Sequence, residues 1–207
     1  MKKPKLRELK EALSSLFSRP YTTKFPFQPH QPAKNFRGKP QFDPDKCVGC
    51  GACAQVCPSR AIEIEDDISA TFPVRRLVHY ASRCIFCGQC QANCIVDRQG
   101  IRMTDQFHLA YFDEKESTHS VEHTLLVCQR CKAVIGPVKH LLWIARRIGP
   151  LSFSHPILIT IHQQSYQLQI QPGPGLKDTP LNRTDVFKII CPKCRHEAWL
   201  ADEKIPT

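Results

Sequence analysis

Two runs of four cysteines constrain this chain more than any other feature of its sequence. Each run has the spacing C-x2-C-x2-C-x3-C; the first reads CVGCGACAQVC and the second reads CIFCGQCQANC. Every cysteine of the second run lies 37 residues after its counterpart, from Cys47 and Cys84 through to Cys57 and Cys94. The duplication predicts a small pseudo-symmetric domain in which a loop, a helical turn and a strand occur twice.

The spacing within each run is typical of 4Fe–4S ligation. Three cysteines spaced by two residues wrap one cubane, and the fourth of each run ligates the other cluster in two-cluster ferredoxins. The first cluster is therefore assigned to Cys47, Cys50, Cys53 and Cys94, and the second to Cys84, Cys87, Cys90 and Cys57. Eight cysteines in duplicated register fit zinc poorly, because a zinc site needs only four. Without clusters this region should be largely unfolded.

Two details of the repeats bear on the cluster environment. Gly51 and Gly88 directly follow the second cysteine of each run. One interpretation is that a Cβ at these positions would crowd the cluster, whereas glycine lets a backbone N–H approach a cluster sulfur. The other is that the glycines serve only as turn residues. The second repeat is also two residues longer after Cys94 than the first is after Cys57. Cluster binding needs only the thiolates, so it should tolerate this difference, but the sequence does not predict the reduction potential of the first cluster.

Two further C-x2-C pairs, separated by 59 residues, predict a third metal site. The four cysteines of this site are Cys128, Cys131, Cys191 and Cys194. Two such knuckles facing each other make a tetrahedral site of four sulfurs. Zinc is the favoured metal, although rubredoxin-like iron uses the same ligands and geometry. The alternative of four metal-free thiols is disfavoured by the paired spacing on both sides.

Composition and charge limit the location and the partners. Cysteine makes up 12 of the 207 residues, and we see neither a signal peptide nor an apolar run that could span a bilayer. We therefore expect a cytoplasmic chain, in which thiols stay reduced and bind metal. The formal net charge is +10, with most of the surplus in residues 1–46. Because metal–thiolate sites carry negative charge, this surplus is only a weak indication of nucleic acid, and no nucleic-acid partner is expected.

The chain is expected to have three segments. Residues 1–46 would form an amphipathic helix and an extended docking arm, residues 47–110 a double 4Fe–4S ferredoxin domain, and residues 124–203 a four-cysteine metal-binding domain. The helix is expected over residues 5–17, and its apolar face carries Leu6, Leu9, Leu13, Leu16 and Phe17. That face is compatible with a membrane subunit, the lipid interface or the chain's own domain as its partner. Prolines are frequent from residue 20 to residue 46, which indicates an extended chain.

Further elements are expected around and after the cluster motifs. They are strands at 61–65, 77–80 and 101–104, a helix at 137–148, and strands at 157–161 and 166–170. Residues 105–123 are polar and show no pattern, so His119 and His123 are expected to be solvated. His79 precedes the second motif, where it would either tune a cluster potential or simply pack. No dinucleotide fingerprint, P-loop or catalytic pocket for an organic substrate is recognisable.

A longer set of motifs resembles a known family. Residues 35–40 read NFRGKP, and they are followed by CVGCGACAQVCPSRAI, by CIFCGQC and by two C-x2-C pairs ending in CPKC. Together these motifs resemble the ferredoxin-type iron–sulfur subunit of formate hydrogenlyase and hydrogenase-4 complexes, which are membrane-bound, energy-converting nickel–iron hydrogenases. The resemblance covers most of residues 20–200. The N-terminal half is also similar to subunit I of NADH–quinone oxidoreductase.

The resemblance implies an electron-transfer subunit with no substrate site of its own. The expected fold is α+β: a two-cluster ferredoxin-like domain with an extended N-terminal arm and a C-terminal zinc-ribbon or rubredoxin-like domain that binds metal through four cysteines. Its partners would be an electron-input iron–sulfur protein, the small hydrogenase subunit and membrane subunits, with the chain peripheral on the cytoplasmic side. The alternatives are a subunit I-like role in an NADH–quinone oxidoreductase-type complex, or a cluster-containing regulatory or nucleic-acid-binding protein.

Overall fold

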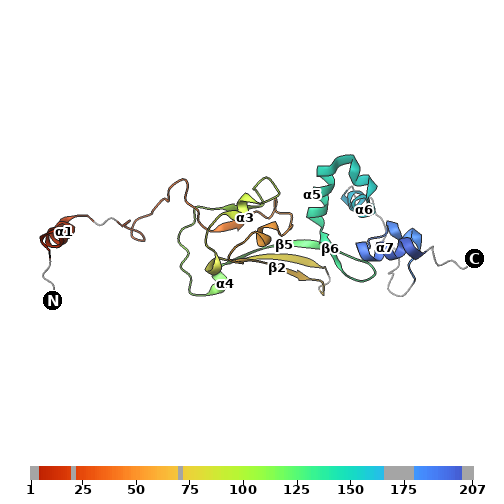
Figure 1. Ribbon diagram of the computed structural model, residues 1–207, viewed down its shortest axis with the longest axis horizontal. Helices are drawn as coiled ribbons and strands as arrows, with labels where there is room; N and C mark the ends of the chain where they lie inside the picture. Colours follow the sequence, from red (N-terminus) through yellow and green to blue (C-terminus); the bar gives the residue numbers. More distant parts are fainter. Residues whose placement is uncertain (1–4, 20–21, 70–71, 166–179, 202–207) are drawn as a thin grey trace, which may run out of the picture. The chain divides into compact units, whose positions relative to one another are not determined.

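The computed structural model describes residues 5–19, 22–69, 72–165 and 180–201 of the chain (Figure 1). The chain divides into two units, Met1–Phe36 and Arg37–Thr207. The strand expected at 166–170 lies outside the described residues. Within the described ranges, no helix combines the length and the hydropathy that a bilayer crossing requires.

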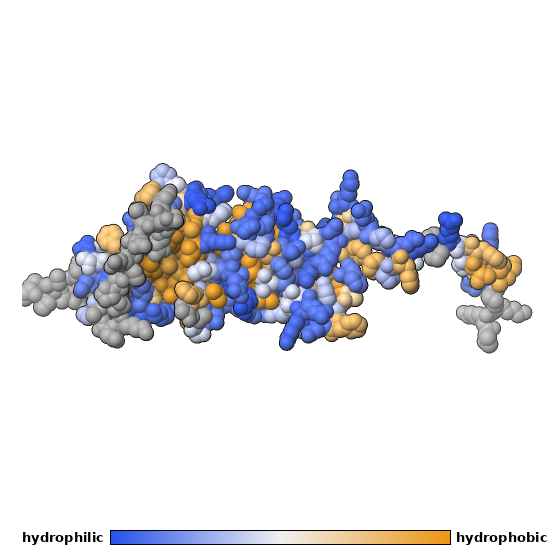
Figure 2. Space-filling view, turned by 180° about the vertical axis from the view of Figure 1, so that it is seen from behind, coloured by the Kyte–Doolittle hydropathy of each residue, from blue (hydrophilic) through white to orange (hydrophobic). Residues whose placement is uncertain are grey.

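The first unit contains helix α1, Leu6–Phe17, which confirms the helix expected over residues 5–17. Its first turn is capped by Glu8, whose carboxylate accepts a hydrogen bond of 3.1 Å from the N–H of Lys5. Every residue of α1 is exposed, including its large apolar side chains. Figure 2 shows these side chains as an orange group on the surface. Within the first unit, the described residues therefore leave the apolar face of α1 uncovered.

The second unit is built on a four-stranded antiparallel sheet with the order β2-β3-β5-β6 (Figure 1). Its strands are β2 (Ile62–Asp67), β3 (Val74–Tyr80), β5 (Thr118–Val127) and β6 (Val134–Pro137). The strands expected at 61–65 and 77–80 are thus confirmed. Cross-strand pairing places His79 beside Ile62 on one side and beside His119 on the other. Two residues earlier on β3, Leu77 pairs with Val121 in the buried centre of the sheet.

Strand β5 was not expected, because residues 105–123 show no pattern in the sequence. In the structure its residues alternate between buried and exposed, with Val121, His123 and Leu125 on the buried side. His123 is 3% exposed, so the expectation that it is solvated was wrong. Polar residues occupy inward positions of this strand, which hides its alternation from a hydrophobicity pattern. The strand also runs across residue 124, where the expected third segment begins.

A second, two-stranded sheet joins the end of the arm to the second repeat. Strand β1 (Pro40–Phe42) pairs antiparallel with β4 (Ile101–Met103), so that Phe42 lies opposite Ile101. Both side chains are buried, at 3% and 2% exposure. The last residues of the expected arm therefore form a strand and contribute to the core. The strand expected at 101–104 is confirmed as β4.

Short helices complete the part of this unit that precedes β6. They are α2 (Ala52–Gln55), the 3-10 helix η1 (Ala81–Arg83), α3 (Gln89–Ala92) and α4 (Glu114–Ser117). Helices α2 and α3 contact each other and occupy equivalent places in the two cysteine repeats. The core that these helices and the sheets share contains eight buried side chains: Phe42, Cys47, Cys53, Ile62, Leu77, Cys90, Ile101 and Val121.

The described C-terminal residues are helical. Their elements are α5 (Val138–Ile148), η2 (Gly149–Ser154), α6 (Pro156–Ser165), η3 (Arg183–Phe187) and α7 (Pro192–Leu200). Helix α5 confirms the expected helix, but α6 replaces the strand expected at 157–161. That expectation was wrong because Pro156 is the first residue of a helix, where proline is favoured. Ile157, Leu158 and Ile161 are buried, and α6 packs against α5.

Candidate metal centres

The structure sorts the eight cysteines of the duplicated motif into two cavities. Three cysteines of one repeat and the fourth of the other line each cavity. The first cavity is lined by Cys47, Cys50, Cys53 and Cys94, and the second by Cys57, Cys84, Cys87 and Cys90. The two cavities are alike in size. The grouping of the cysteines is the one that the spacing predicts. Ligation of clusters by these thiols stays a prediction.

The loops that present the cysteines have the same backbone shape in both repeats. Gly49 and Phe86 hold equivalent positions with φ values of 73° and 53°, and Gly51 and Gly88 follow with 79° and 77°. Left-handed backbone of this kind favours glycine. A Cβ on Gly51 would also lie 2.6 Å from Cδ1 of Ile64. The role of these glycines as turn residues therefore has a direct structural reason.

The longer turn of the second repeat still delivers its last cysteine to the first cavity. Asp97 and Arg98 adopt φ values of 47° and 61°, and these two successive left-handed residues form the turn after Cys94. The chain then passes close to the cysteines, since a Cβ on Gly100 would lie 3.0 Å from Sγ of Cys94 and 3.3 Å from Cα of Cys47. The two extra residues are thus absorbed without displacing Cys94 from the cavity.

The protonation of these cysteines favours a cationic occupant. Burial raises the pKa of Cys47 to about 11, of Cys53 to about 12 and of Cys90 to about 11. For Cys57 burial acts in the same direction, but hydrogen bonds from Ser59 and from the N–H of Ala61 outweigh it and lower the pKa. Buried thiols become thiolates when a metal offsets their charge. Clustered thiols that share apolar cavities therefore fit 4Fe–4S groups.

Positive side chains hold the loops around both cavities. Arg75 Nη1 donates to the carbonyl oxygen of Gly49 at 3.4 Å, and Arg37 Nη1 donates to that of Cys87 at 2.9 Å. Lys139 of α5 reaches back to the carbonyl oxygen of Pro44 at 2.9 Å. Such groups complement the negative charge of a cluster bound by four thiolates. None of the three was identified as a site residue from the sequence, because their partners are backbone carbonyls distant in the chain.

Two buried histidines lie beside the cavities. His79 is 0% exposed and lines the second cavity. His123 packs against the first loop, since a Cβ on Gly49 would lie 2.7 Å from its Cδ2. Among the described residues, neither ring nitrogen of either histidine has a hydrogen-bond partner. Burial lowers the pKa of both to about 4, so both imidazoles are neutral near pH 7.

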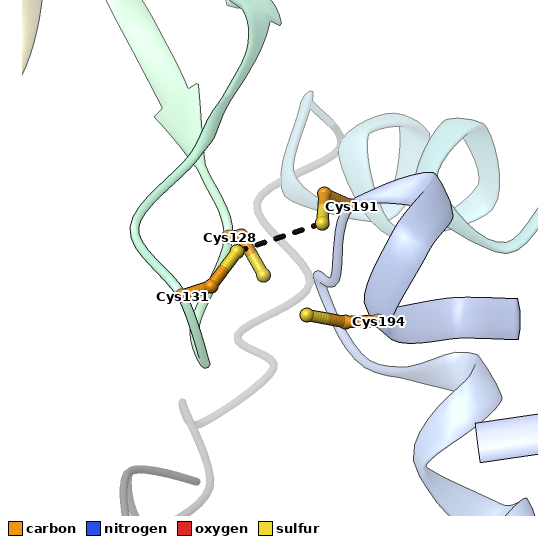
Figure 3. A group of neighbouring side chains, drawn as sticks. All are labelled: Cys128, Cys131, Cys191 and Cys194. Carbon is orange, nitrogen blue, oxygen red and sulfur yellow. Dashed lines mark hydrogen bonds between the residues drawn. The ribbon is translucent and has the colours of Figure 1, made fainter. Parts of the chain in front are cut away.

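The four remaining cysteines come together at a third site (Figure 3). Cys128 and Cys131 lie in the turn between β5 and β6, and Cys191 and Cys194 lie at the start of α7. The second pair is therefore at a helix N-terminus and not in a second hairpin. All four Sγ atoms lie within 4.8 Å of one another, and those of Cys131 and Cys191 are 3.6 Å apart.

This sulfur arrangement fits a tetrahedral metal ion. Zn–S bonds of about 2.3 Å place the sulfurs about 3.8 Å apart in a tetrahedron. Burial raises the pKa of Cys128, but N–H groups of Cys131 and Cys191 outweigh it and bring the pKa to about 7. A thiol that ionises this readily is a good metal ligand. Apart from the exposed Cys131, the ligand set is buried.

Comparisons with known proteins agree with the cysteine chemistry. Residues 40–63 match the family model described as a 4Fe-4S binding domain. "NADH-quinone oxidoreductase subunit I 2" of Geobacter metallireducens is 34% identical over 128 residues, which cover 59% of this chain and 96% of that relative. "Formate hydrogenlyase subunit 6" of Escherichia coli is 46% identical over 48 residues, which cover 23% of this chain and 27% of that relative.

Another relative and a solved structure match over about half of their own length. "NAD(P)H-quinone oxidoreductase subunit I" of Gloeobacter violaceus is 29% identical over 101 residues, and the match spans 47% of each chain. A chain of the membrane-bound sulfane sulfur reductase, described as an archaeal respiratory membrane complex, is 31% identical. The similarity covers 56% of this chain and 61% of that one, with a TM-score of 0.38.

Proposed function

We propose, from the premise that this chain belongs to the family of ferredoxin-type iron–sulfur subunits represented by NADH–quinone oxidoreductase subunit I, that it carries single electrons through two 4Fe–4S clusters in a membrane-bound multisubunit complex. One observation carries the proposal: the eight cysteines line two cavities, and each cavity receives three cysteines from one repeat and one from the other. When bound, a 4Fe–4S cluster supplies a one-electron redox centre.

The chain itself would bind, shield and position the two centres. Cys57 and Cys94 each cross to the cavity of the other repeat, so both cavities depend on one shared framework. Phe42, Leu77 and Ile101 line the first cavity and are nearly inaccessible to solvent. Their packing excludes water from the cavity, which is one of the means by which a protein sets a cluster's potential.

We assign this subunit to a nickel–iron hydrogenase complex of the formate hydrogenlyase type. The 46% identity with formate hydrogenlyase subunit 6 and the additional group of four cysteines support this assignment. Its partners would be the small hydrogenase subunit, membrane subunits and an electron-input iron–sulfur protein, with the chain peripheral on the cytoplasmic side. The second candidate is a subunit I-like component of an NADH–quinone oxidoreductase-type complex, which the longer match over 128 residues favours.

The three segments would then have separate tasks. Residues 47–110 would supply the cluster ligands, and residues 124–203 a zinc-ribbon-like domain with four cysteine ligands, with zinc favoured over rubredoxin-like iron. Residues 1–46 would dock the chain on the membrane part of the complex. The exposed apolar face of α1 supports this task. Exposure of apolar side chains to water is unfavourable, and burial against a partner surface would remove that exposure. Lys5 and Lys10 would lie near acidic lipid headgroups.

Metal analysis and purification from membranes test the proposal. An anaerobically prepared full chain should contain about eight irons and one zinc, or about nine irons if the third site holds iron. Chemical reduction should produce a paramagnetic signal. The chain should co-purify with a nickel-containing large subunit, whereas co-purification with NADH-reactive subunits would select the second candidate. A chain that contains no iron would refute the assignment.

A further inference from the structure

His79 is the strongest unexplained group in the described part of the chain. It lies near the end of β3, is 0% exposed, and lines the second cavity together with Cys57, Cys84, Cys87 and Cys90. Within the described residues, neither Nδ1 nor Nε2 has a hydrogen-bond partner. A buried polar atom without a partner is unfavourable, so an orphaned imidazole at this cavity requires an explanation.

Among the described residues, the protein around His79 supplies no hydrogen-bond acceptor for its ring. An imidazole carries at least one N–H donor whether it is neutral or protonated. His119, the cross-strand neighbour, is stacked on Phe42 with the ring centroids 5.7 Å apart. A group bound in the cavity would bring an acceptor into the space that His79 lines.

We propose that His79 donates its N–H to a sulfur of the group bound in the second cavity and thereby raises the reduction potential of that centre. This inference rests on the proposed function, that is, on a 4Fe–4S cluster in this cavity. Reduction adds negative charge to an anionic centre, so a donor to its sulfur stabilises the reduced form more than the oxidised form.

The first cavity offers no equivalent donor. No histidine is found among the described residues that line it. His123, the nearest counterpart on β5, instead packs against Gly49 on the backbone of the loop. The hydrogen bond of His79 would therefore act on only one of the two centres, and it would shift the reduction potential of that centre relative to the first.

A redox titration of the anaerobic full chain, followed by electron paramagnetic resonance, tests this inference. In His79→Leu, the ratio of reduced to oxidised centre at a fixed potential should fall about tenfold for one of the two centres, which corresponds to about 59 mV. His79→Gln and His79→Asn carry an amide N–H in place of one ring nitrogen or the other, and at least one of them should restore the wild-type value. His108→Leu, which removes an exposed histidine, is the control and should titrate like wild type.

The inference is overturned if His79→Leu retains its iron and both centres titrate as in wild type. A second measurement needs no variant. In the wild-type chain labelled with ¹⁵N-histidine, pulsed paramagnetic resonance of the reduced protein should detect a histidine nitrogen coupled to a centre. The absence of that coupling would overturn the inference even if His79→Leu lost its clusters. A chain that binds no iron would instead refute the proposed function itself.

Discussion

Arg75 of β3 and Asp66 of β2 form two parallel hydrogen bonds of 2.7 Å, from Nε to Oδ1 and from Nη2 to Oδ2. The side chains are 16% and 27% exposed, so solvent screens this pair only partly. The remaining nitrogen of Arg75, Nη1, donates to the carbonyl oxygen of Gly49 in the first cysteine loop. One guanidinium therefore joins two strands of the sheet to the loop that lines the first cavity.

Replacing this arginine should destabilise the first centre selectively. In Arg75→Met, we expect a loss of about 1–3 kcal/mol in the free energy of unfolding, because Asp66 keeps a partly buried charge without its partner. Iron should also be released faster to a chelator from one centre than from the other. The matched control is Arg76→Met on the same strand, whose exposed pair with Glu122 should contribute much less to stability because solvent screens it. Equal losses in the two variants would contradict the assignment.

The crossed arrangement of cysteines predicts paired and opposite effects of two substitutions. Cys94→Ser should damage the centre held by the first repeat, and Cys57→Ser the centre held by the second, because each cysteine lines the cavity of the other repeat. Arg75→Met provides the reference for the first centre, so Cys94→Ser and not Cys57→Ser should remove the signal that Arg75→Met weakens. Iron analysis and paramagnetic resonance measure both effects. The reverse pattern would show that each repeat binds its own cluster.

The acid stability of the C-terminal residues should depend on Asp185. The N–H of Asn182 and the ammonium of Lys188 hydrogen-bond this carboxylate at 2.8 and 2.9 Å and hold its pKa below the ordinary 3.8. A pKa that is depressed by folding contributes stability above 3.8, and this stability is lost as the pH falls through the folded-state value. In Asp185→Asn, the deficit in unfolding free energy should therefore be largest at neutral pH and shrink in acid. Denaturant unfolding at stepwise lower pH measures it, and a deficit independent of pH would contradict the prediction.

Removing the metal of the third site should loosen the C-terminal helices without emptying the cluster cavities. The buried sulfurs pack with Leu181, Val186 and Ile190, and burial raises the pKa of Cys194 to about 12. Without a metal this thiol would be neutral, and the site would lose the bonds that join the β5–β6 turn to α7. In Cys194→Ser we expect the loss of one metal per chain and faster proteolysis after residue 180, with about eight irons retained. Loss of all iron would contradict the independence of the sites.

The exposed face of α1 should act in docking alone. Leu9→Glu and Leu13→Glu place charges on its apolar side, and both should weaken attachment to the membrane complex while leaving the metal content unchanged. Ser15→Glu adds the same charge on another face of the helix and serves as the control. Retention of Leu13→Glu chains in the complex at the wild-type level would show that this face does not contact the partner.

Local spacing predicted the chemistry of this chain but not the strands that support it. The cysteine loops, the third site, α1 and α5 were predictable because each depends on residues close in sequence. Strand β5 and the pairing of β1 with β4 were not predictable, since they depend on partners distant in the chain, as between Pro40 and Met103. Helix α6 was misassigned because a β-branched run at a proline-initiated helix resembles a strand.

The amino-acid sequence by itself determined which thiols can bind metal, because ligand spacing is a local property of the backbone. Only the tertiary structure decided which other groups lie beside those thiols. The burial of His79 in the second cavity, and the contacts of Arg75 and Arg37 with the cysteine loops, arise from sheet register and long-range packing. Polar groups affect a bound centre most when folding removes them from water, and the pattern of residues along the sequence does not show which polar groups are buried.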